Sequence, residues 1–220
     1  MNEHTLQESF GNIDIYVFDQ LLKGRFFSGM RVLDAGCGTG RNLVYFLRHG
    51  YQVCGVDQSA ESINQVRRLA STLAPHLPAE NFRVEPVEAM SFGIDQQSNS
   101  DRSDKEGFDV VISSAVLHFA RDEEQWQAMI NEMWRVLKPG GIFFARLAST
   151  IGMEQQVRLI DGRRFHLPDG SDRFLVDEEM LRSVTASLGG EFIEPIKTTV
   201  VEDLRAMTTW VIKKGEEGKG

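Results

Sequence analysis

The sequence has few cysteines and no long apolar run, and both shortages limit the class of protein. Its 220 residues include two cysteines, Cys37 and Cys54, and neither has a metal-binding spacing. This argues against a disulfide framework and favours a reducing compartment. No apolar run approaches the roughly 20 residues that span a bilayer. The first residues, MNEHTLQESFGN, lack the pattern of a signal peptide. We therefore expect a cytoplasmic protein with no membrane partner.

Basic charge is also in short supply. Lysine and arginine number 24 against 32 acidic residues, which gives a net charge of −8. Such a surface repels a phosphate backbone, so nucleic acid is not an expected partner. Histidine and the acidic residues form no cluster with metal-ligand spacing, and we predict no metal. The overall composition, with 41% hydrophobic and 25% charged residues, is ordinary for a globular protein.

The organising pattern is an alternation of strand and helix. Apolar stretches predict strands at 30–35, 51–56, 82–87, 108–116 and 142–148. Helical periodicity lies between them, at 39–49, 59–73 and 122–137, and Ser59 and Asp122 are the candidate N-caps of the second and third helices. Helices of this length between strands imply parallel pairing with right-handed crossovers. The prediction is an α/β fold: a doubly wound, mostly parallel seven-stranded sheet with helices on both faces.

The rhythm changes after Ser149. Residues 150–175 are polar and rich in turn residues, a helix is predicted at about 177–188, and strand-like stretches follow at 191–201 and 205–213. We expect one domain over 1–220. Its parts are an N-terminal helix region (1–29), a cofactor-binding core (30–148), a small lid (149–176) and a C-terminal helix and strand pair (177–213). The polar stretch 93–107 is interpreted as a flexible surface loop.

The N-terminal region contains an aromatic-rich helical pattern at 12–25. Ile15, Phe18, Leu21 and Leu22 form its apolar stripe. We expect this helix to pack on the sheet.

Glycine occupies every second position after the first predicted strand, in VLDAGCGTGRN. Gly36, Gly38 and Gly40 permit a tight turn, let a ligand lie against the backbone, and are expected to leave N–H groups free for it. The spacing is not the G-x-G-x-x-G of dinucleotide sites, and no phosphate-binding P-loop motif is present. Asp57, at the end of the second strand, is placed to accept ribose hydroxyls. These features indicate adenosine without separating a nicotinamide cofactor from S-adenosylmethionine (SAM).

Four segments together narrow the choice between a nicotinamide cofactor and SAM. VLDAGCGTGRN, VCGVDQS, FDVVISSAVLHF and MWRVLKPGGIFFARL resemble, in order and spacing, the class I (Rossmann-like) SAM-dependent methyltransferases. The resemblance covers about residues 30–148. It implies SAM as cofactor, S-adenosylhomocysteine (SAH) as product, and methyl transfer to an acceptor by in-line displacement. The acidic surface and single short lid favour a small-molecule acceptor.

The resemblance also implies which residues hold the cofactor. Asp34 and the backbone of Gly36, Cys37 and Gly38 would hold the methionine part, with Asn42 in the same stretch. Asp57 would take the ribose hydroxyls and Gln58 would pack near the adenine. Ser113 and Ser114, at the end of the fourth strand, would lie under the sulfonium. The N-terminal helix region (1–29) would cover the cofactor, with Tyr16 as a candidate contact.

One position departs from the family pattern. Pro86 stands where related proteins often carry an acid that holds the adenine edge. Glu85, Glu88 or the Val87 N–H are the candidates to replace that acid, and we favour Val87 and Glu88.

Two residues are candidates for contact with the acceptor. His118, just after the fourth strand, is either a general base for the acceptor or a structural histidine. Arg146, in the apolar fifth strand, either binds an anionic acceptor or forms a structural ion pair. A nicotinamide-dependent oxidoreductase and a non-catalytic SAM-binding protein remain as alternative functions, and the sequence does not assign an oligomeric state.

Overall fold

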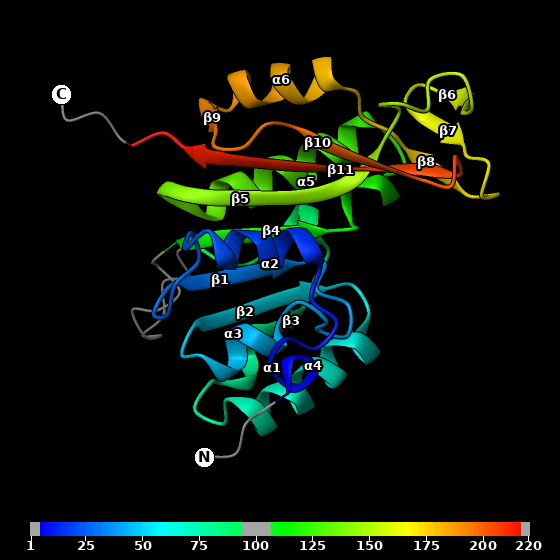
Figure 1. The fold of residues 1–220 in the computed structure, drawn as a ribbon. Helices are drawn as coiled ribbons and strands as arrows, with labels where there is room; N and C mark the ends of the chain where they lie inside the picture. The colour runs from blue at the N-terminus through cyan, green and yellow to red at the C-terminus, as the bar shows by residue number, and fades with distance from the viewer. Residues whose placement is uncertain (1–4, 94–106, 217–220) are drawn as a thin grey trace. The chain divides into compact units, whose positions relative to one another are not determined.

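The computed structural model describes residues 5–93 and 107–216. Its chain divides into two compact units, Met1–Ile112 and Ser113–Gly220. The strand β4 (Phe108–Ser114) begins in the first unit and ends in the second (Figure 1). Most of the stretch predicted to be a flexible loop, residues 94–106, lies outside the described residues.

The first unit is built on parallel strands. Its strands are β1 (Arg31–Ala35), β2 (Gln52–Asp57), β3 (Phe82–Val84) and the first part of β4. β1 pairs with β2 and with β4, and β2 pairs with β3, all in parallel. Val32, Leu33 and Val53 are fully buried, as expected for strands covered on both faces. The carboxyl ends of β1, β2 and β3 therefore meet at one edge of this sheet.

One helix of this unit, α4 (Ala60–Leu73), begins where its capping residue predicts. The Ser59 side chain accepts the Ser62 N–H and starts the helix, whose buried stripe is Ile63, Val66 and Ala70. α3 (Val44–Arg48) is shorter than the predicted helix over 39–49, because the glycine turn occupies the residues before it. Two short 3-10 helices, η1 (Ala79–Asn81) and η2 (Val87–Ala89), flank β3.

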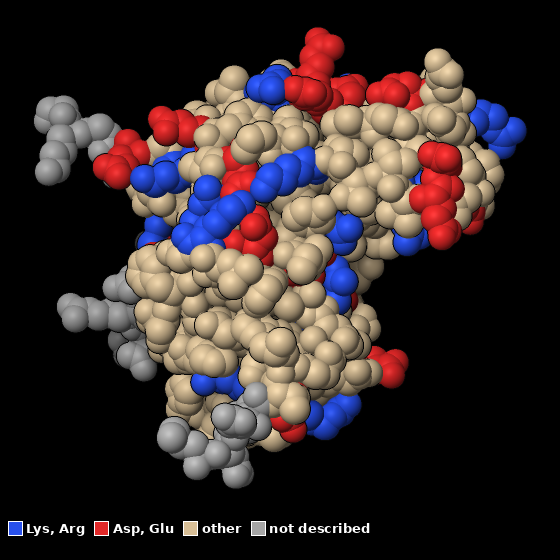
Figure 2. Space-filling model, in the orientation of Figure 1, with Lys and Arg blue, Asp and Glu red and all other residues tan. Residues whose placement is uncertain are grey.

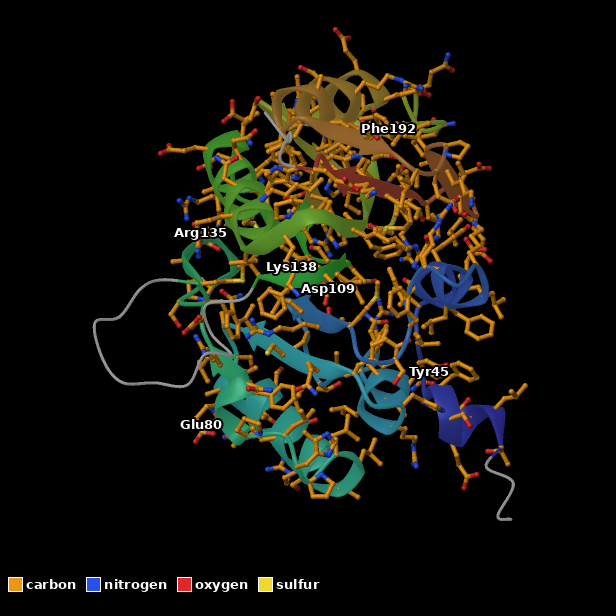
Figure 3. All side chains as sticks on the ribbon, turned by 90° about the vertical axis from the view of Figure 1, so that its left-hand side faces the viewer. Tyr45, Glu80, Asp109, Arg135, Lys138 and Phe192 are labelled. Atoms are coloured by element: carbon orange, nitrogen blue, oxygen red, sulfur yellow. The ribbon has the colours of Figure 1, made fainter. Side chains whose placement is uncertain are left out.

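The N-terminal region forms two helices, α1 (Leu6–Phe10) and α2 (Ile15–Leu22). The predicted apolar stripe of α2 is wrong at its two ends: Ile15 and Leu22 are exposed, Phe18 and Leu21 are half-buried, and the buried residues are Val17 and Gln20. The Gln20 side chain, which the pattern treats as polar surface, accepts from Arg25 Nη1 at 2.7 Å. α1 packs on α3 through Tyr45, labelled in Figure 3, whose ring stacks on Phe10 with centroids 4.8 Å apart.

The second unit contains antiparallel pairs. They link β5 (Leu137–Ser149), β9 (Gly190–Phe192), β10 (Lys197–Val201) and β11 (Arg205–Lys214). β11 pairs with β5, β9 and β10. α5 (Glu123–Val136) begins at its predicted cap, Asp122. Its Trp126 stacks with Trp210 and Phe174 in the core, and the Trp210 indole N–H donates to Thr185 Oγ1 at 3.0 Å.

The segment after β5 is more ordered than its composition predicts. It contains a three-stranded antiparallel sheet of β6 (Arg158–Asp161), β7 (Arg164–His166) and β8 (Asp172–Phe174). α6 (Glu178–Ser187) follows and lies along the strands β9–β11 in Figure 1. Leu167 and Leu175 pack with Ala148 and Met207, so this small sheet shares a core with β5 and β11. Its action as a lid stays a prediction.

Among the described residues, the path of the main sheet has seven strands of mixed direction, and β9 joins as a further partner of β11. The predicted strand between 191 and 201 is divided into β9 and β10. The break spans Ile193 to Ile196 and contains Pro195, which cannot donate a ladder hydrogen bond.

Candidate functional site

The glycine turn after β1 owes its shape to backbone angles that side chains rarely adopt. Gly36, Gly38 and Gly40 have φ of 80°, 52° and 85°. A Cβ on Gly40 would also lie 3.2 Å from Val66 Cγ2 on α4, whereas a Cβ on Gly38 would meet nothing within 4 Å. A side chain at Gly40 would therefore press on α4, while Gly38 faces open space where a ligand has room.

The N–H groups of this turn are not free, contrary to the expectation from sequence. Gly36 N and Cys37 N both donate to Val56 O at 2.9 Å. Gly38 N donates to Asp57 Oδ2 at 2.9 Å. These bonds hold the turn against the end of β2. A ligand at the turn can therefore bind to acceptor groups and occupy the open space, but it cannot use these three N–H donors.

Asp34 is the buried acceptor at the end of β1. It is 1% exposed, and its Oδ2 has no hydrogen-bond partner among the described residues. Burial raises the pKa of the Asp34 carboxyl from 3.8 to about 7, although Arg41 and a hydrogen bond from Asn42 act in the opposite direction. A buried carboxylate oxygen without a donor is costly unless a ligand supplies one.

Asn42 links this carboxylate to the N-terminal region. It is 3% exposed, and its Oδ1 accepts the Asp14 N–H at 3.0 Å. Asp14 itself caps α2 by accepting from Tyr16 N, and Arg41 lies 3.7 Å from its other oxygen. Sequence reasoning missed Asp14. Its signal was the N-cap position before the apolar run of α2.

Asp57 ends β2 with its carboxylate turned toward the glycine turn. Oδ2 accepts from Gly38 N, and Oδ1 accepts from Ser59 N at 2.8 Å. A carboxylate has about four lone-pair sites, so two of them remain after these bonds. The neighbouring Gln58 is exposed. The structure therefore places Asp57 at the same sheet edge as Asp34, because both residues end parallel neighbouring strands.

The segment after β3 sits beside Asp57, since Glu85 N donates to Asp57 O at 3.1 Å. The Glu85 carboxylate is engaged by Ser91, through its N–H at 2.9 Å and its hydroxyl at 2.5 Å. Val87 is buried at the start of η2, and Glu88 is half-buried. Of the acids proposed to replace the one missing at Pro86, Glu85 thus has a structural task already.

Cys37 is 4% exposed and its Sγ packs against the glycine of β2, where a Cβ on Gly55 would lie 3.1 Å away. Burial, together with the charges of Asp34 and Asp57, raises the pKa of the thiol well above its usual range. The side chain is therefore an inert, protonated part of the core, and only its backbone belongs to the turn.

In the second unit, β4 ends in two buried serines. Ser113 is fully buried and its Oγ has no hydrogen-bond partner in the described part of the chain. Ser114 is 7% exposed. The next residue, Ala115, has φ of 64°, a strained value for a side chain with a Cβ. Such strain marks the place where the chain leaves the strand.

His118 follows in η4 (Leu117–Phe119) and is 7% exposed. Its Nδ1 accepts the Ala148 N–H at 3.3 Å. Burial lowers the pKa of His118 to about 4, and the charges of Arg173, Arg146 and Arg205 act in the same direction. Arg146 is half-buried on β5 and its carbonyl accepts the Ala115 N–H at 2.8 Å. The structure thus brings both acceptor candidates into one neighbourhood of the second unit.

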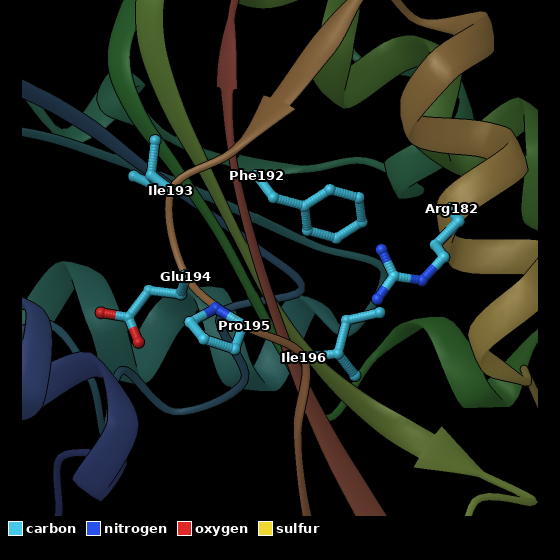
Figure 4. A pocket seen from close by; sticks show the side chains of 6 residues that line it. All are labelled: Arg182, Phe192, Ile193, Glu194, Pro195 and Ile196. Atoms are coloured by element: carbon cyan, nitrogen blue, oxygen red, sulfur yellow. The ribbon is translucent and has the colours of Figure 1, made fainter.

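A separate surface pocket lies between α6 and the β9–β10 connection. Figure 4 shows Arg182 and Phe192 facing each other across it, while the Glu194 side chain points away. The Arg182 guanidinium lies 5.5 Å from the Phe192 ring centroid and bonds to Glu178 at 2.6 Å. None of the predicted site residues lines this pocket.

Figure 2 shows acidic and basic side chains interspersed on the visible face. In residues 5–93 and 107–216, no three histidine, cysteine or acidic residues group as metal ligands. No helix in the same ranges has the length and apolar character of a membrane span.

Comparison with solved structures supports the fold. The magnesium protoporphyrin IX methyltransferase of Synechocystis PCC 6803 matches with a TM-score of 0.64 and 16% identity, over 92% of this chain and 77% of that one. The cyclase SpnF matches with a TM-score of 0.66 and 19% identity, over 91% of this chain and 81% of the cyclase chain. The predicted doubly wound α/β fold is confirmed, and the cyclase shows that this fold is not confined to one reaction.

Comparison of sequences gives relatives with named activities. The malonyl-(acyl-carrier protein) O-methyltransferase of Enterobacter lignolyticus is 29% identical over 181 residues, which cover 80% of this chain and 61% of the relative. This chain thus spans less than two thirds of that relative's length. The family model described as "Methyltransferase domain" matches residues 32–141, which include the glycine turn, Asp34, Asp57 and the end of β4. The chain belongs to the methyltransferase-domain family.

Proposed function

We propose that this protein transfers a methyl group from SAM to a small-molecule acceptor. The observation that carries the proposal is the buried Asp34 Oδ2, which has no donor among the described residues, beside a glycine turn with open space at Gly38. An ammonium group is the donor that such a carboxylate lacks, and the methionine part of SAM carries one.

The residues of the first unit fit the cofactor in their donor and acceptor chemistry. Asp34, held by Asn42, would accept from the methionine ammonium. Asp57 has acceptor sites beyond its bonds to Gly38 and Ser59, and these would take ribose hydroxyls. The Val87 N–H and the Glu88 carboxylate would hold the adenine edge, and the exposed Gln58 would pack near the ring.

The residues of the second unit would serve the acceptor and the reacting end. Ser113 has a buried hydroxyl without a partner in the described chain, and Ser114 follows it at the end of β4. His118 and Arg146 are proposed to contact the acceptor. The acceptor is a small molecule, and the protein works in the cytoplasm.

When bound, SAM supplies a methyl group on a positively charged sulfur, which needs no further activation. The task of the chain is therefore to align donor and acceptor and to exclude water. Asp34 fixes one end of the cofactor by charge, and Asp57 fixes the ribose by hydrogen bonds. A group that removes a proton is required only where the acceptor nucleophile carries one.

Calorimetry with SAM, SAH and NAD(P)H tests the cofactor. We expect SAM and SAH to bind and NAD(P)H not to bind, and we expect Asp34→Asn to weaken both SAM and SAH. SAH release with a panel of thiols, amines, phenols and carboxylates then tests the transfer. Binding of NAD(P)H in place of SAM would replace the proposal with an oxidoreductase. SAM binding with no release across the panel would favour a non-catalytic SAM-binding protein.

A further inference from the structure

His118 is held as a hydrogen-bond donor, not as a base. The Ala148 N–H can only donate, so the Nδ1 that it contacts at 3.3 Å carries the lone pair of the imidazole. In the neutral ring the proton then belongs to Nε2. Nε2 makes no hydrogen bond to the described residues and is not one of their fully buried unpartnered atoms, so this nitrogen is the part of the largely buried ring that reaches solvent. An accessible N–H on a ring held in place by its other nitrogen can donate to an acceptor on a ligand.

The backbone explains why a histidine takes this position. The Ala115 N–H bonds to Arg146 O at 2.8 Å, as in a parallel pair. With φ of 64° at Ala115, the chain turns out of the strand, and the next N–H on that edge of β5, from Ala148, has no strand partner. The imidazole takes the place of the missing carbonyl. Its ring orientation is therefore fixed by the sheet itself.

Positive charge gathers around this ring from three elements of the second unit. Arg146 on β5, Arg173 on β8 and Arg205 at the start of β11 all act electrostatically on His118. Arg205 is already paired with Asp169 at 3.6 Å. Arg173 lies over the Phe119 ring at 4.8 Å, and that ring lies 4.5 Å from the imidazole.

Phe119 supplies an apolar surface beside these donors. Its side chain is 63% exposed although it adjoins a buried histidine, and an arginine covers one part of it. The neighbourhood thus offers a fixed neutral N–H, guanidinium groups and an accessible aromatic ring. A molecule with a flat apolar body and an anionic end matches this combination.

We propose that His118 and Arg173, with Arg146, bind a carboxylate group of the methyl acceptor, so that the substrates are organic carboxylates with an apolar body. The inference rests on the proposed methyl transfer and names its substrate class. A planar carboxylate can accept from a guanidinium fork and from the imidazole N–H at once. His118 in this arrangement binds the substrate and does not remove a proton.

The test measures binding of benzoate and its neutral counterpart benzamide to the full chain at pH 7 in the presence of SAH. We expect benzoate to bind at least about tenfold more tightly than benzamide, as one charge-assisted bond provides. Arg173→Met is expected to remove most of this preference. The matched control is Arg182→Met, which removes another arginine that lies over a phenyl ring and should leave both affinities unchanged.

His118→Asn separates the two nitrogens of the imidazole. The asparagine carbonyl can still accept from Ala148 N, whereas the donor at Nε2 is lost. We expect benzoate to bind about tenfold more weakly with SAH affinity unchanged. A purely structural histidine would instead leave benzoate binding unaffected in this variant.

The outcomes distinguish this inference from the proposed function. If SAH fails to bind to the native chain, the proposed function is wrong and the substrate class falls with it. If SAH binds, equal affinity for benzoate and benzamide would overturn the carboxylate site, as would unchanged benzoate affinity in both variants. Phenyl phosphate binding more than tenfold tighter than benzoate would also overturn it, in favour of a phosphorylated acceptor.

Discussion

The raised pKa of Asp34 predicts that SAM and SAH bind more weakly in acid. The carboxyl titrates near pH 7 in the ligand-free protein because it is fully buried. A ligand ammonium requires the ionised form, so each protein molecule that holds the proton must release it before binding. Lowering the pH from 7 to 5 is the perturbation.

The magnitude follows from the titration of a single group. With a pKa of about 7, roughly half of the molecules are ionised at pH 7 and about one in a hundred at pH 5. The affinity should therefore fall about fiftyfold between these values, which corresponds to about 2.3 kcal/mol. The ammonium of the ligand stays protonated over this range, since α-amino groups titrate near 7.7 to 8.0, and contributes little to the change.

Calorimetry with SAH at half-unit steps of pH measures the effect. Asp34→Asn is the control, because it keeps every histidine and every other carboxyl while removing this titration. Its affinity should be weak and nearly constant from pH 5 to 7. A native profile that changes less than threefold, or the same slope in native and variant protein, would refute the assignment of the ammonium to Asp34.

Four substitutions, one of them the Asp34→Asn control, test the same site by other measurements. Asp34→Asn should raise the melting temperature of the ligand-free protein at pH 8, because the folded-state pKa lies above the unfolded value of 3.8 and stability is lost as pH rises from about 4 to 7. That loss is at most about 4 kcal/mol, and a variant no more stable than native at pH 8 would contradict it. Gly40→Ala should lower the melting temperature by about 3 to 6 °C through its φ of 85° and its contact with Val66. Gly38→Ala adds a methyl group that meets no neighbour, so it should lower the melting temperature less than Gly40→Ala does. A larger fall for Gly38→Ala would contradict the contact between Gly40 and Val66. Asp57→Asn should weaken SAH binding about tenfold or more in calorimetry, because the amide cannot accept from Gly38 and Ser59 and serve ribose as well; unchanged affinity would remove Asp57 from the site.

Local patterns determined the elements that carry strong periodicity or a capping side chain. α4 and α5 begin at Ser59 and Asp122 as predicted, because an N-cap bond forms within four residues. The parallel strands β1, β2 and β4 could also be predicted, because strands that are covered on both faces carry apolar residues at successive positions. The buried face of α2 could not be predicted in this way. Gln20 is buried there and accepts a hydrogen bond from Arg25, a partner that helical periodicity does not identify.

The sequence alone determined which residues stand at the strand ends, and from them the family and the carboxylates Asp34 and Asp57. Only the tertiary structure decided how those groups are used. In the folded chain the N–H groups of Gly36, Cys37 and Gly38 donate to β2. Asp34 Oδ2 has no donor among the described residues. The tertiary structure also turns His118 from a candidate base into a donor, by pairing Nδ1 with Ala148, 30 residues away in the chain. Spacing along a chain can place a residue at the end of a strand. Which of its atoms keeps a lone pair or a proton depends on neighbours that only folding brings together.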